Sequence, residues 1–202
     1  MRMPKEKKIE RRGFFLHGLN FLAAKVSEGM GELAERERRA GVPIRPPGAV
    51  DEEAFLSLCT KCDDCLKACP HGSIKKAGGE WGRRIKGTPV IIPSEGPCRL
   101  CEDLPCIKAC APKALLPVKD RSEVRMGTAR IKKELCFAWS GASGVCLLCS
   151  LKCPLRGTAI IVDDSKPVVI EEKCAGCGLC ESACIAINNP PAIKVEKGSY
   201  KS

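Results

Sequence analysis

The sequence predicts a small α+β fold made of two similar modules of short strands and helices, preceded by an N-terminal amphipathic helical arm. Its 202 residues suffice for one domain, or for two small ones with an arm. Aromatic residues are scarce, with five Phe, two Trp and one Tyr, which excludes a large aromatic core. Sixteen cysteines fall into four groups separated by short apolar runs, and they must supply the cohesion that the core lacks.

Composition divides the chain into five parts. Residues 1–40 are basic, residues 41–50 are rich in proline, and a short polar tail covers 198–202. Between them, residues 51–117 and 118–197 each contain two of the cysteine groups. We expect the first part to be a helix, the second to be a linker, and the two long parts to be the two modules.

The N-terminal arm combines a helical pattern with an export-like motif. Apolar residues recur at helical spacing from Phe15 to Leu33, so the arm is expected to form an amphipathic helix. Arg11 and Arg12 precede Phe14 and Phe15, an order similar to twin-arginine export signals. The arm is thus either an export signal, cleaved or retained, or a docking helix. No apolar stretch approaches the length of a membrane span, so we expect a soluble or peripheral protein.

Short β-type runs lie between the cysteine groups. They cover residues 88–92 and 128–131, and a further pair covers 159–162 and 168–170. The polar residues 163–166 separate the last two runs, which predicts a hairpin. Each cysteine group is followed by residues that could form one or two helical turns. The repeating unit is therefore expected to be strand, cysteine loop and short helix.

The spacing of the cysteines predicts iron-sulfur clusters. The first group is followed by Pro70 and has the order C-x2-C-x2-C-x3-C-P, which is typical of 4Fe–4S ligands in bacterial proteins. The fourth group repeats the spacing without the proline, and the second lengthens one gap to four residues. The expected ligands of four 4Fe–4S clusters are Cys59, Cys62, Cys65 and Cys69; Cys98, Cys101, Cys106 and Cys110; Cys136, Cys146, Cys149 and Cys153; and Cys174, Cys177, Cys180 and Cys184.

The third group departs most from this spacing. Nine residues separate Cys136 from Cys146, whereas Cys149 and Cys153 follow at normal distances. Residues 130–135 have the composition of a strand that leads into a cluster loop, which favours Cys136 as the first ligand. Residues 137–145 are then expected to be an inserted loop.

The first three cysteines of a group can wrap one cluster while the fourth reaches a neighbouring cluster. Such sharing implies that the groups work in pairs, but the sequence leaves two pairings open. The first group could pair with the second and the third with the fourth, or the first could pair with the fourth around a nested second and third. All three intervening segments are long enough for the usual hairpin between loops, so their lengths do not decide the pairing, and we slightly favour the sequential one.

Other uses of the cysteines fit the spacing less well. Structural zinc sites separate two C-x2-C pairs by about a dozen residues or more, and disulfides between such crowded cysteines would be strained. Radical enzymes that cleave S-adenosylmethionine use a C-x3-C-x2-C order that is absent here. The chain also has no glycine-rich dinucleotide loop and no phosphate-binding loop, so we expect an electron carrier and not an enzyme.

The net charge does not indicate a nucleic-acid partner. Lys and Arg number 34 against 24 Asp and Glu, a formal charge of +10. A 4Fe–4S site with four thiolates adds about −2, so four sites would bring the loaded protein to about +2. The chain also lacks a basic stripe interleaved with aromatic residues.

Several segments together resemble a known family. Residues 45–49 with the first cysteine group, residues 87–89 and residues 97–106 are similar to ferredoxin-type proteins of periplasmic nitrate reduction and methylamine utilisation, the NapG/MauM type. The resemblance extends to the twin-arginine arm, the isolated Cys136 and the closing residues 192–195. Ala111 stands where the family usually has a proline after Cys110.

The resemblance implies two ferredoxin-like modules and electron transfer between a membrane-bound quinol dehydrogenase and a redox acceptor protein. It also implies a periplasmic location reached by twin-arginine export. Two alternatives remain open from the residues themselves. One is a cytoplasmic electron-transfer subunit of a larger oxidoreductase complex, with the arm as its docking helix. The other is a zinc-bound structural or interaction module.

Overall fold

The computed structural model describes residues 42–141 and 144–197. The expected arm, residues 1–40, and the tail, residues 198–202, lie outside the described residues. All sixteen cysteines lie within the described residues.

The regular elements of the described residues are short. The helices are α2 (Glu52–Leu58), α3 (Asp64–Ala68), α4 (Pro105–Lys108), α5 (Phe137–Ser140), α6 (Leu148–Leu151) and α7 (Leu179–Ile185). The strands are β1 (Ile74–Lys76), β2 (Pro89–Ile91), β3 (Thr128–Ile131), β4 (Ile160–Asp163), β5 (Lys166–Val169) and β6 (Ile193–Glu196). Further 3-10 turns cover Gly79–Trp81, Arg121–Glu123, Lys133–Leu135 and Glu171–Lys173. None of the described helices combines the length and the apolar character needed to span a membrane.

The strands form two-stranded antiparallel ladders, in which β1 pairs with β2, β3 with β6 and β4 with β5. β4 and β5 are joined directly by Asp164 and Ser165, which both have positive φ, as the type I′ two-residue hairpin turn requires. The hairpin expected from the sequence is therefore confirmed. A small α+β fold is confirmed as well, whereas the ferredoxin-like character of its two modules stays a prediction.

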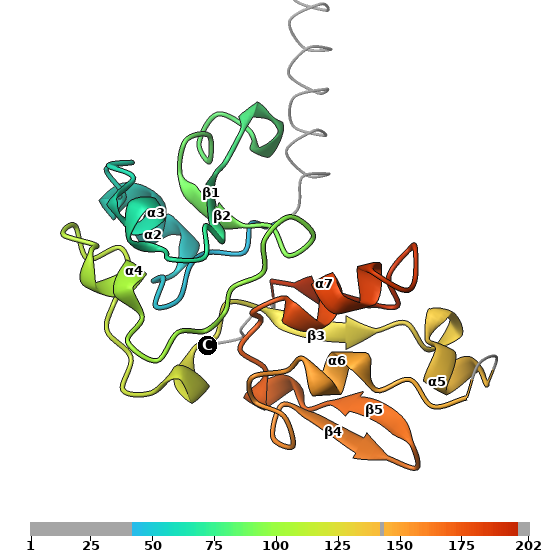
Figure 1. Cartoon of the computed structure of the whole chain (residues 1–202). Helices are drawn as coiled ribbons and strands as arrows, with labels where there is room; N and C mark the ends of the chain where they lie inside the picture. The colour runs from blue at the N-terminus through green and yellow to red at the C-terminus, as the bar shows by residue number, and fades with distance from the viewer. Residues whose placement is uncertain (1–41, 142–143, 198–202) are drawn as a thin grey trace, which may run out of the picture. The chain divides into compact units, whose positions relative to one another are not determined.

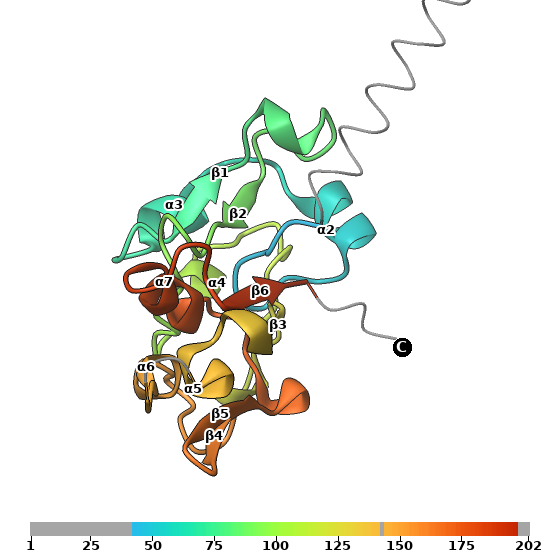
Figure 2. The ribbon, with the colours of Figure 1, turned by 90° about the vertical axis from the view of Figure 1, so that its right-hand side faces the viewer.

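The same strand layout occurs twice along the chain. In the second half, β3 and β6 pair around the inner hairpin β4–β5. In the first half, β1 and β2 form the inner hairpin, and a single bridge between Ala49 and Leu115 takes the place of the outer pair. Figures 1 and 2 show α2–α4 around the first hairpin and α5–α7 around the second. The repeat seen in the cysteine spacing is thus a repeat of the backbone path.

Apart from α2, which precedes Cys59, the described helices begin inside the cysteine groups, whereas the sequence led us to expect them after each group. α3 contains Cys65 and ends just before Cys69, and α7 contains both Cys180 and Cys184. A turn of helix between the third and fourth cysteines moves the fourth thiol away from the first three. α3 packs beside α4 and α6 beside α7, so each fourth thiol is carried toward a neighbouring group.

Two expectations around Cys136 are corrected. β3 ends at Ile131, and Lys133–Leu135 is a 3-10 turn instead of a continuation of the strand. The segment after Cys136 is not wholly a loop, because Phe137–Ser140 forms α5. Trp139 stabilises this turn, since its indole N–H donates to the carbonyl of Pro167 at 3.0 Å.

The proline-rich segment expected as a linker packs into the body of the protein. Pro43, Pro46 and Pro47 are fully buried, and Ile44 forms a bridge with Ile91 of β2. Arg45 is also buried, with 2% of its surface exposed. Residues 43–47 therefore belong to the core that supports the first cysteine loop.

Gly176 is required by a close approach of two backbones. It has a φ of +69°, and a Cβ at this position would lie 2.3 Å from the amide nitrogen of Gly127. We expect Gly176→Ala to lower the midpoint of thermal unfolding by more than 10 °C, because both the backbone strain and the clash must be relieved. Gly157→Ala is the matched control, since Gly157 also has positive φ but open space around its Cα. Equal effects of the two substitutions would contradict the role of the contact.

Candidate metal centres

The structure gathers the sixteen cysteines around four cavities, each lined by four thiols. Each cavity takes three cysteines from one sequence group and the last cysteine of another group. Site A is lined by Cys59, Cys62, Cys65 and Cys110. Site B is lined by Cys69, Cys98, Cys101 and Cys106. Site C is lined by Cys153, Cys174, Cys177 and Cys180. Site D is lined by Cys136, Cys146, Cys149 and Cys184.

This arrangement corresponds to the sequential pairing of groups. The first and second groups exchange their last cysteines, Cys69 and Cys110, between sites A and B. The third and fourth groups exchange Cys153 and Cys184 between sites C and D. None of the four cavities combines cysteines of the first group with cysteines of the fourth, as the nested pairing would require.

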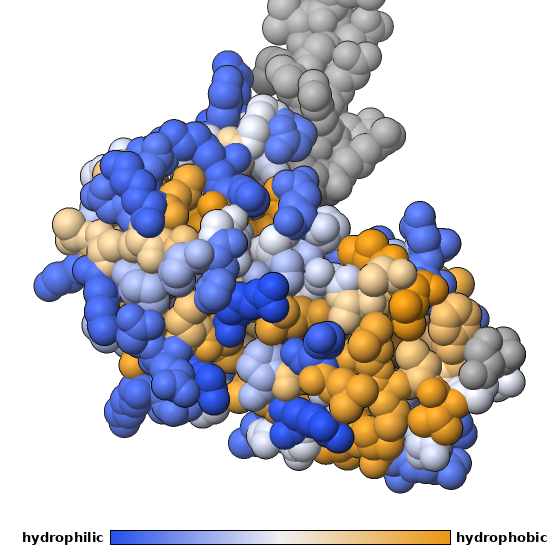
Figure 3. Space-filling model, in the orientation of Figure 1, coloured by the Kyte–Doolittle hydropathy of each residue, from blue (hydrophilic) through white to orange (hydrophobic). Residues whose placement is uncertain are grey.

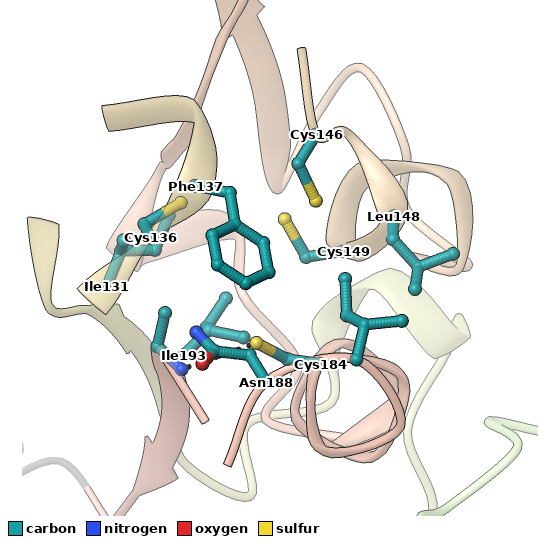
Figure 4. Close-up of a pocket in the computed structure, with 11 residues that line it drawn as sticks. Ile131, Cys136, Phe137, Cys146, Leu148, Cys149, Cys184, Asn188 and Ile193 are labelled. Carbon is teal, nitrogen blue, oxygen red and sulfur yellow. Dashed lines mark hydrogen bonds between the residues drawn. The ribbon is translucent and has the colours of Figure 1, made fainter. Parts of the chain in front are cut away.

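Site D contains the cysteine whose assignment was least secure from spacing. Cys136 lines the same cavity as Cys146, Cys149 and Cys184, and Figure 4 shows their sulfur atoms around a common space. The structure thus brings Cys136 to its group despite the intervening nine residues. Apolar side chains, among them Phe137 of α5, and the polar Asn188 close the rest of the cavity wall.

In each site the four thiols surround a cavity and do not converge on a single point. The empty space at each of the four cavities, counted together with the part open to solvent, is about 320 to 380 Å³. Within the described residues, no three side chains of His, Cys, Asp or Glu come close enough to hold a single metal ion. A four-thiol ring around a cavity is a donor set that suits a multinuclear iron-sulfur core.

The loops that carry the thiols turn tightly, and several of their residues adopt left-handed backbone conformations. Lys61 and Asp63 flank Cys62 in site A with φ of 60° and 66°, and Leu100 in site B has a φ of 53°. Such conformations are costly for residues with a Cβ. Site C meets the same requirement with Gly176 and Gly178.

Backbone amides donate to three of the thiols. Leu100 N–H donates to Cys98 Sγ at 3.4 Å, Ala129 N–H to Cys174 Sγ at 3.4 Å, and Ala192 N–H to Cys184 Sγ at 3.3 Å. Amide donors stabilise the negative charge of sulfur ligands and raise the reduction potential of a cluster. Ala129 and Ala192 were not foreseen as part of a site, because an amide donor leaves no signal in the identity of its side chain.

Burial raises the pKa of many of the thiols. For Cys65 the pKa rises to about 12, through burial first and then through the neighbouring Cys110, Cys59 and Cys62. Burial, with smaller effects of neighbouring thiols, also raises the pKa of Cys98, Cys106 and Cys177 to about 12 and that of Cys149 to about 11. These thiols are protonated at neutral pH without a metal, so metal binding must displace their protons.

The four sites adjoin one another in the order A, B, C, D. Sites A and B share the packed helices α3 and α4, and sites C and D share α6 and α7. Sites B and C meet where Cys98 N–H donates to the carbonyl of Cys177 at 2.8 Å. Leu100, which is fully buried, belongs to the loop of site B and also lines site C.

Site A is also supported by a buried residue, Arg45, to which the sequence analysis assigned no role. The Arg45 guanidinium stacks on Phe55 at 4.5 Å and donates to the carbonyl of Pro89 at 2.8 Å, and both of these residues line site A. Its charge is balanced by two hydrogen bonds to Glu52, at 3.1 and 2.5 Å. The only signal in the sequence was a single arginine within the proline-rich segment, followed seven residues later by Glu52.

No family model matches the chain, and no solved structure matches it. Curated relatives do match. The ferredoxin-type protein NapG of Escherichia coli (strain K12) is 35% identical over 185 residues, which cover 85% of this chain and 78% of the relative.

Two methylamine utilization ferredoxin-type proteins MauM are similar to the same extent. The protein of Paracoccus denitrificans is 38% identical over 70% of this chain and 66% of its own length. That of Methylorubrum extorquens is 32% identical over 91% of this chain and 88% of its own length. The chain therefore belongs to the family of ferredoxin-type proteins that includes NapG and MauM.

Proposed function

We propose that this protein is an electron carrier that binds four 4Fe–4S clusters, one in each of sites A to D. The observation that supports this best is the repeated set of four thiols around each cavity, contributed as three cysteines from one group and one from another. A bound 4Fe–4S cluster would supply one-electron chemistry at each site, with no bond made or broken in a substrate.

The chain's own residues would hold and tune these sites. The amides of Leu100, Ala129 and Ala192 would stabilise charge on the ligand sulfurs. Because each fourth cysteine comes from the partner group, every pair of sites is tied together by two exchanged segments. The adjoining order A, B, C, D would let electrons cross the molecule in short steps between neighbouring sites.

The proposed role is transfer between a membrane-bound quinol dehydrogenase and a redox acceptor protein, without a substrate site of its own. Membership in a family named ferredoxin-type supports electron transfer, and the names of the relatives connect them to methylamine utilization in the case of MauM. We further propose twin-arginine export to the periplasm, based on Arg11 and Arg12. Fractionation of the native host tests this, since full recovery in the cytoplasm would favour a subunit of a cytoplasmic complex.

Metal analysis tests the cluster content directly. We expect about sixteen iron and about sixteen acid-labile sulfide per chain after anaerobic purification. Low-temperature EPR after dithionite reduction should show broadened, interacting signals, because reduced clusters in adjoining sites couple magnetically. Stoichiometric zinc without sulfide would overturn the proposal and favour a structural module.

A further inference from the structure

Site A has one ligand that is exposed at the surface. Of the sixteen cysteines, all within the described residues, Cys62 alone is exposed. It lies between Lys61 and Asp63 in the tight loop that precedes α3, and all three residues line the site. By contrast, the three cysteines that one group contributes to site C, Cys174 through Cys180, are all buried. An electron entering or leaving at Cys62 would have the least protein to cross.

The acidic side chains beside this opening are already paired. Asp63 forms an ion pair with Lys76 at 2.5 Å, and Asp64 forms one with Lys67 at 3.3 Å. The negative charges next to Cys62 are therefore balanced by lysines of their own. Asp63 and Asp64 therefore do not form ion pairs with the other lysines around the opening.

Three further lysines around the opening have no acidic partner. Lys61, Lys86 and Lys113 are exposed, and none forms an ion pair in the described part of the chain. The Lys61 ammonium donates to the carbonyl of Lys86 at 2.9 Å, which holds the two residues side by side. Lys113 stands between Pro112 and Ala114, which both line site A. We call these three lysines the basic rim.

The opposite end of the series of sites has a different surface. Around site D the exposed side chains include Leu135, Val145, Leu151 and Ile187, with 38 to 65% of their surfaces accessible. Figure 3 shows the corresponding contrast, with hydrophilic side chains over the first half of the body and a broad hydrophobic area over α5 to α7. The two ends of the series of sites thus differ in surface chemistry.

We propose that the basic rim is the docking surface for an acidic redox protein that exchanges electrons with the cluster of site A. This rests on the proposed function, since the surface would serve no transfer without a cluster. One electron passes between the partner and site A in each encounter: one centre is oxidised, the other is reduced, and no proton or leaving group moves. Unpaired lysines around an exposed ligand raise the encounter rate of an anionic partner and orient it toward the opening.

Electron exchange with small charged oxidants tests the surface. The dithionite-reduced holoprotein is mixed in a stopped-flow instrument with the cobalt(III) complex of EDTA, an anion, or with hexaamminecobalt(III), a cation. Each oxidant accepts one electron. We expect the rate with the anion to fall about threefold to tenfold between low and physiological ionic strength. A rate with the anion that does not depend on salt would overturn the proposal.

Two triple variants that remove the same number of positive charges test where on the surface the salt-dependent rate arises. Replacing Lys61, Lys86 and Lys113 by Gln should lower the ratio of anion to cation rates at least about threefold. The control replaces Lys119, Lys132 and Lys194 by Gln, which removes the same charge away from the cavity linings of site A. Equal changes in both variants would show that net charge alone matters and would contradict a local docking surface.

A binding measurement provides a readout that does not depend on electron transfer. Hexacyanochromate(III), a paramagnetic anion that is redox-inert here, is titrated into the isotope-labelled oxidised holoprotein. NMR signals of Lys61, Lys86 and Lys113 should broaden first, and broadening centred elsewhere would overturn the assignment. Iron and sulfide are measured on every sample. A sample without clusters would refute the proposed function, whereas full clusters without a charge effect would refute only the basic rim.

Discussion

Replacing Cys69 by Ala should damage the cluster of site B, although Cys69 belongs to the first cysteine group. Cys69 lines the cavity of Cys98, Cys101 and Cys106, and the other three cysteines of its own group line site A. With three thiols, site B would hold a 3Fe–4S cluster or none, so the iron content should fall from about sixteen to between about fifteen and about twelve per chain, while site A keeps its four thiols. Iron and sulfide analysis with EPR measures the loss.

Double variants separate this arrangement from clusters confined to one sequence group. Cys62→Ala with Cys110→Ala removes two ligands from site A alone, so its cluster should be lost and iron should fall to about twelve, with the EPR signals of the other sites unchanged. Cys62→Ala with Cys69→Ala removes one ligand from each of sites A and B, so two clusters should lose iron and the EPR signals of both should change. If the second pair cost no more iron than Cys62→Ala alone, the exchange of the fourth cysteines would be wrong.

Arg45→Ala should destabilise the protein by about 3 kcal/mol, because a buried guanidinium leaves its partners unpaired. Its side chain is 2% exposed and donates to Thr88, Pro89 and Glu52. Burial raises the pKa of Glu52, but the hydrogen bonds from Arg45 and Lys197 outweigh it and leave that pKa below its ordinary value. Urea unfolding under anaerobic conditions, followed by circular dichroism, measures the change.

Two further variants control this prediction. Arg130→Ala removes a half-exposed arginine that pairs with Glu171 at 3.1 Å, so it should cost less than about 1 kcal/mol. Arg45→Lys keeps the charge but not the planar fork, and should recover only part of the loss. An Arg45→Ala protein as stable as Arg130→Ala would show that the buried network does not support the first loop. Because Arg45 contacts Phe55 and Pro89, cluster loss in this variant should begin at site A.

The sequence was most informative where the residues that form a feature lie close together in the chain. The short gaps within each cysteine group predicted four sets of thiols, and the polar residues 163–166 between two apolar runs predicted the β4–β5 hairpin. Both depend on residues close in the chain, whose relative positions are restricted by a few backbone angles. The helices were misplaced by a few residues, because the same residues serve both the cysteine loop and the helix.

Longer-range features could not be read in this way. β1 contains one apolar residue in Ile74–Lys76 and becomes a strand because it pairs with β2. β6 pairs with β3 across more than sixty residues. The basic rim likewise joins Lys61, Lys86 and Lys113 from three separate loops, and no local pattern marks them as neighbours.

The amino-acid sequence by itself determined the kind of donor and the number of thiol sets. It reduced the pairing of the cysteine groups to two alternatives. The tertiary structure decided that choice geometrically, because α3 packs against α4 and α6 against α7, so each fourth cysteine reaches the cavity of the adjacent group. It also decided which ligand is exposed and which charges surround it. Spacing defines what a segment can bind, whereas packing between distant segments defines what lies next to the bound group.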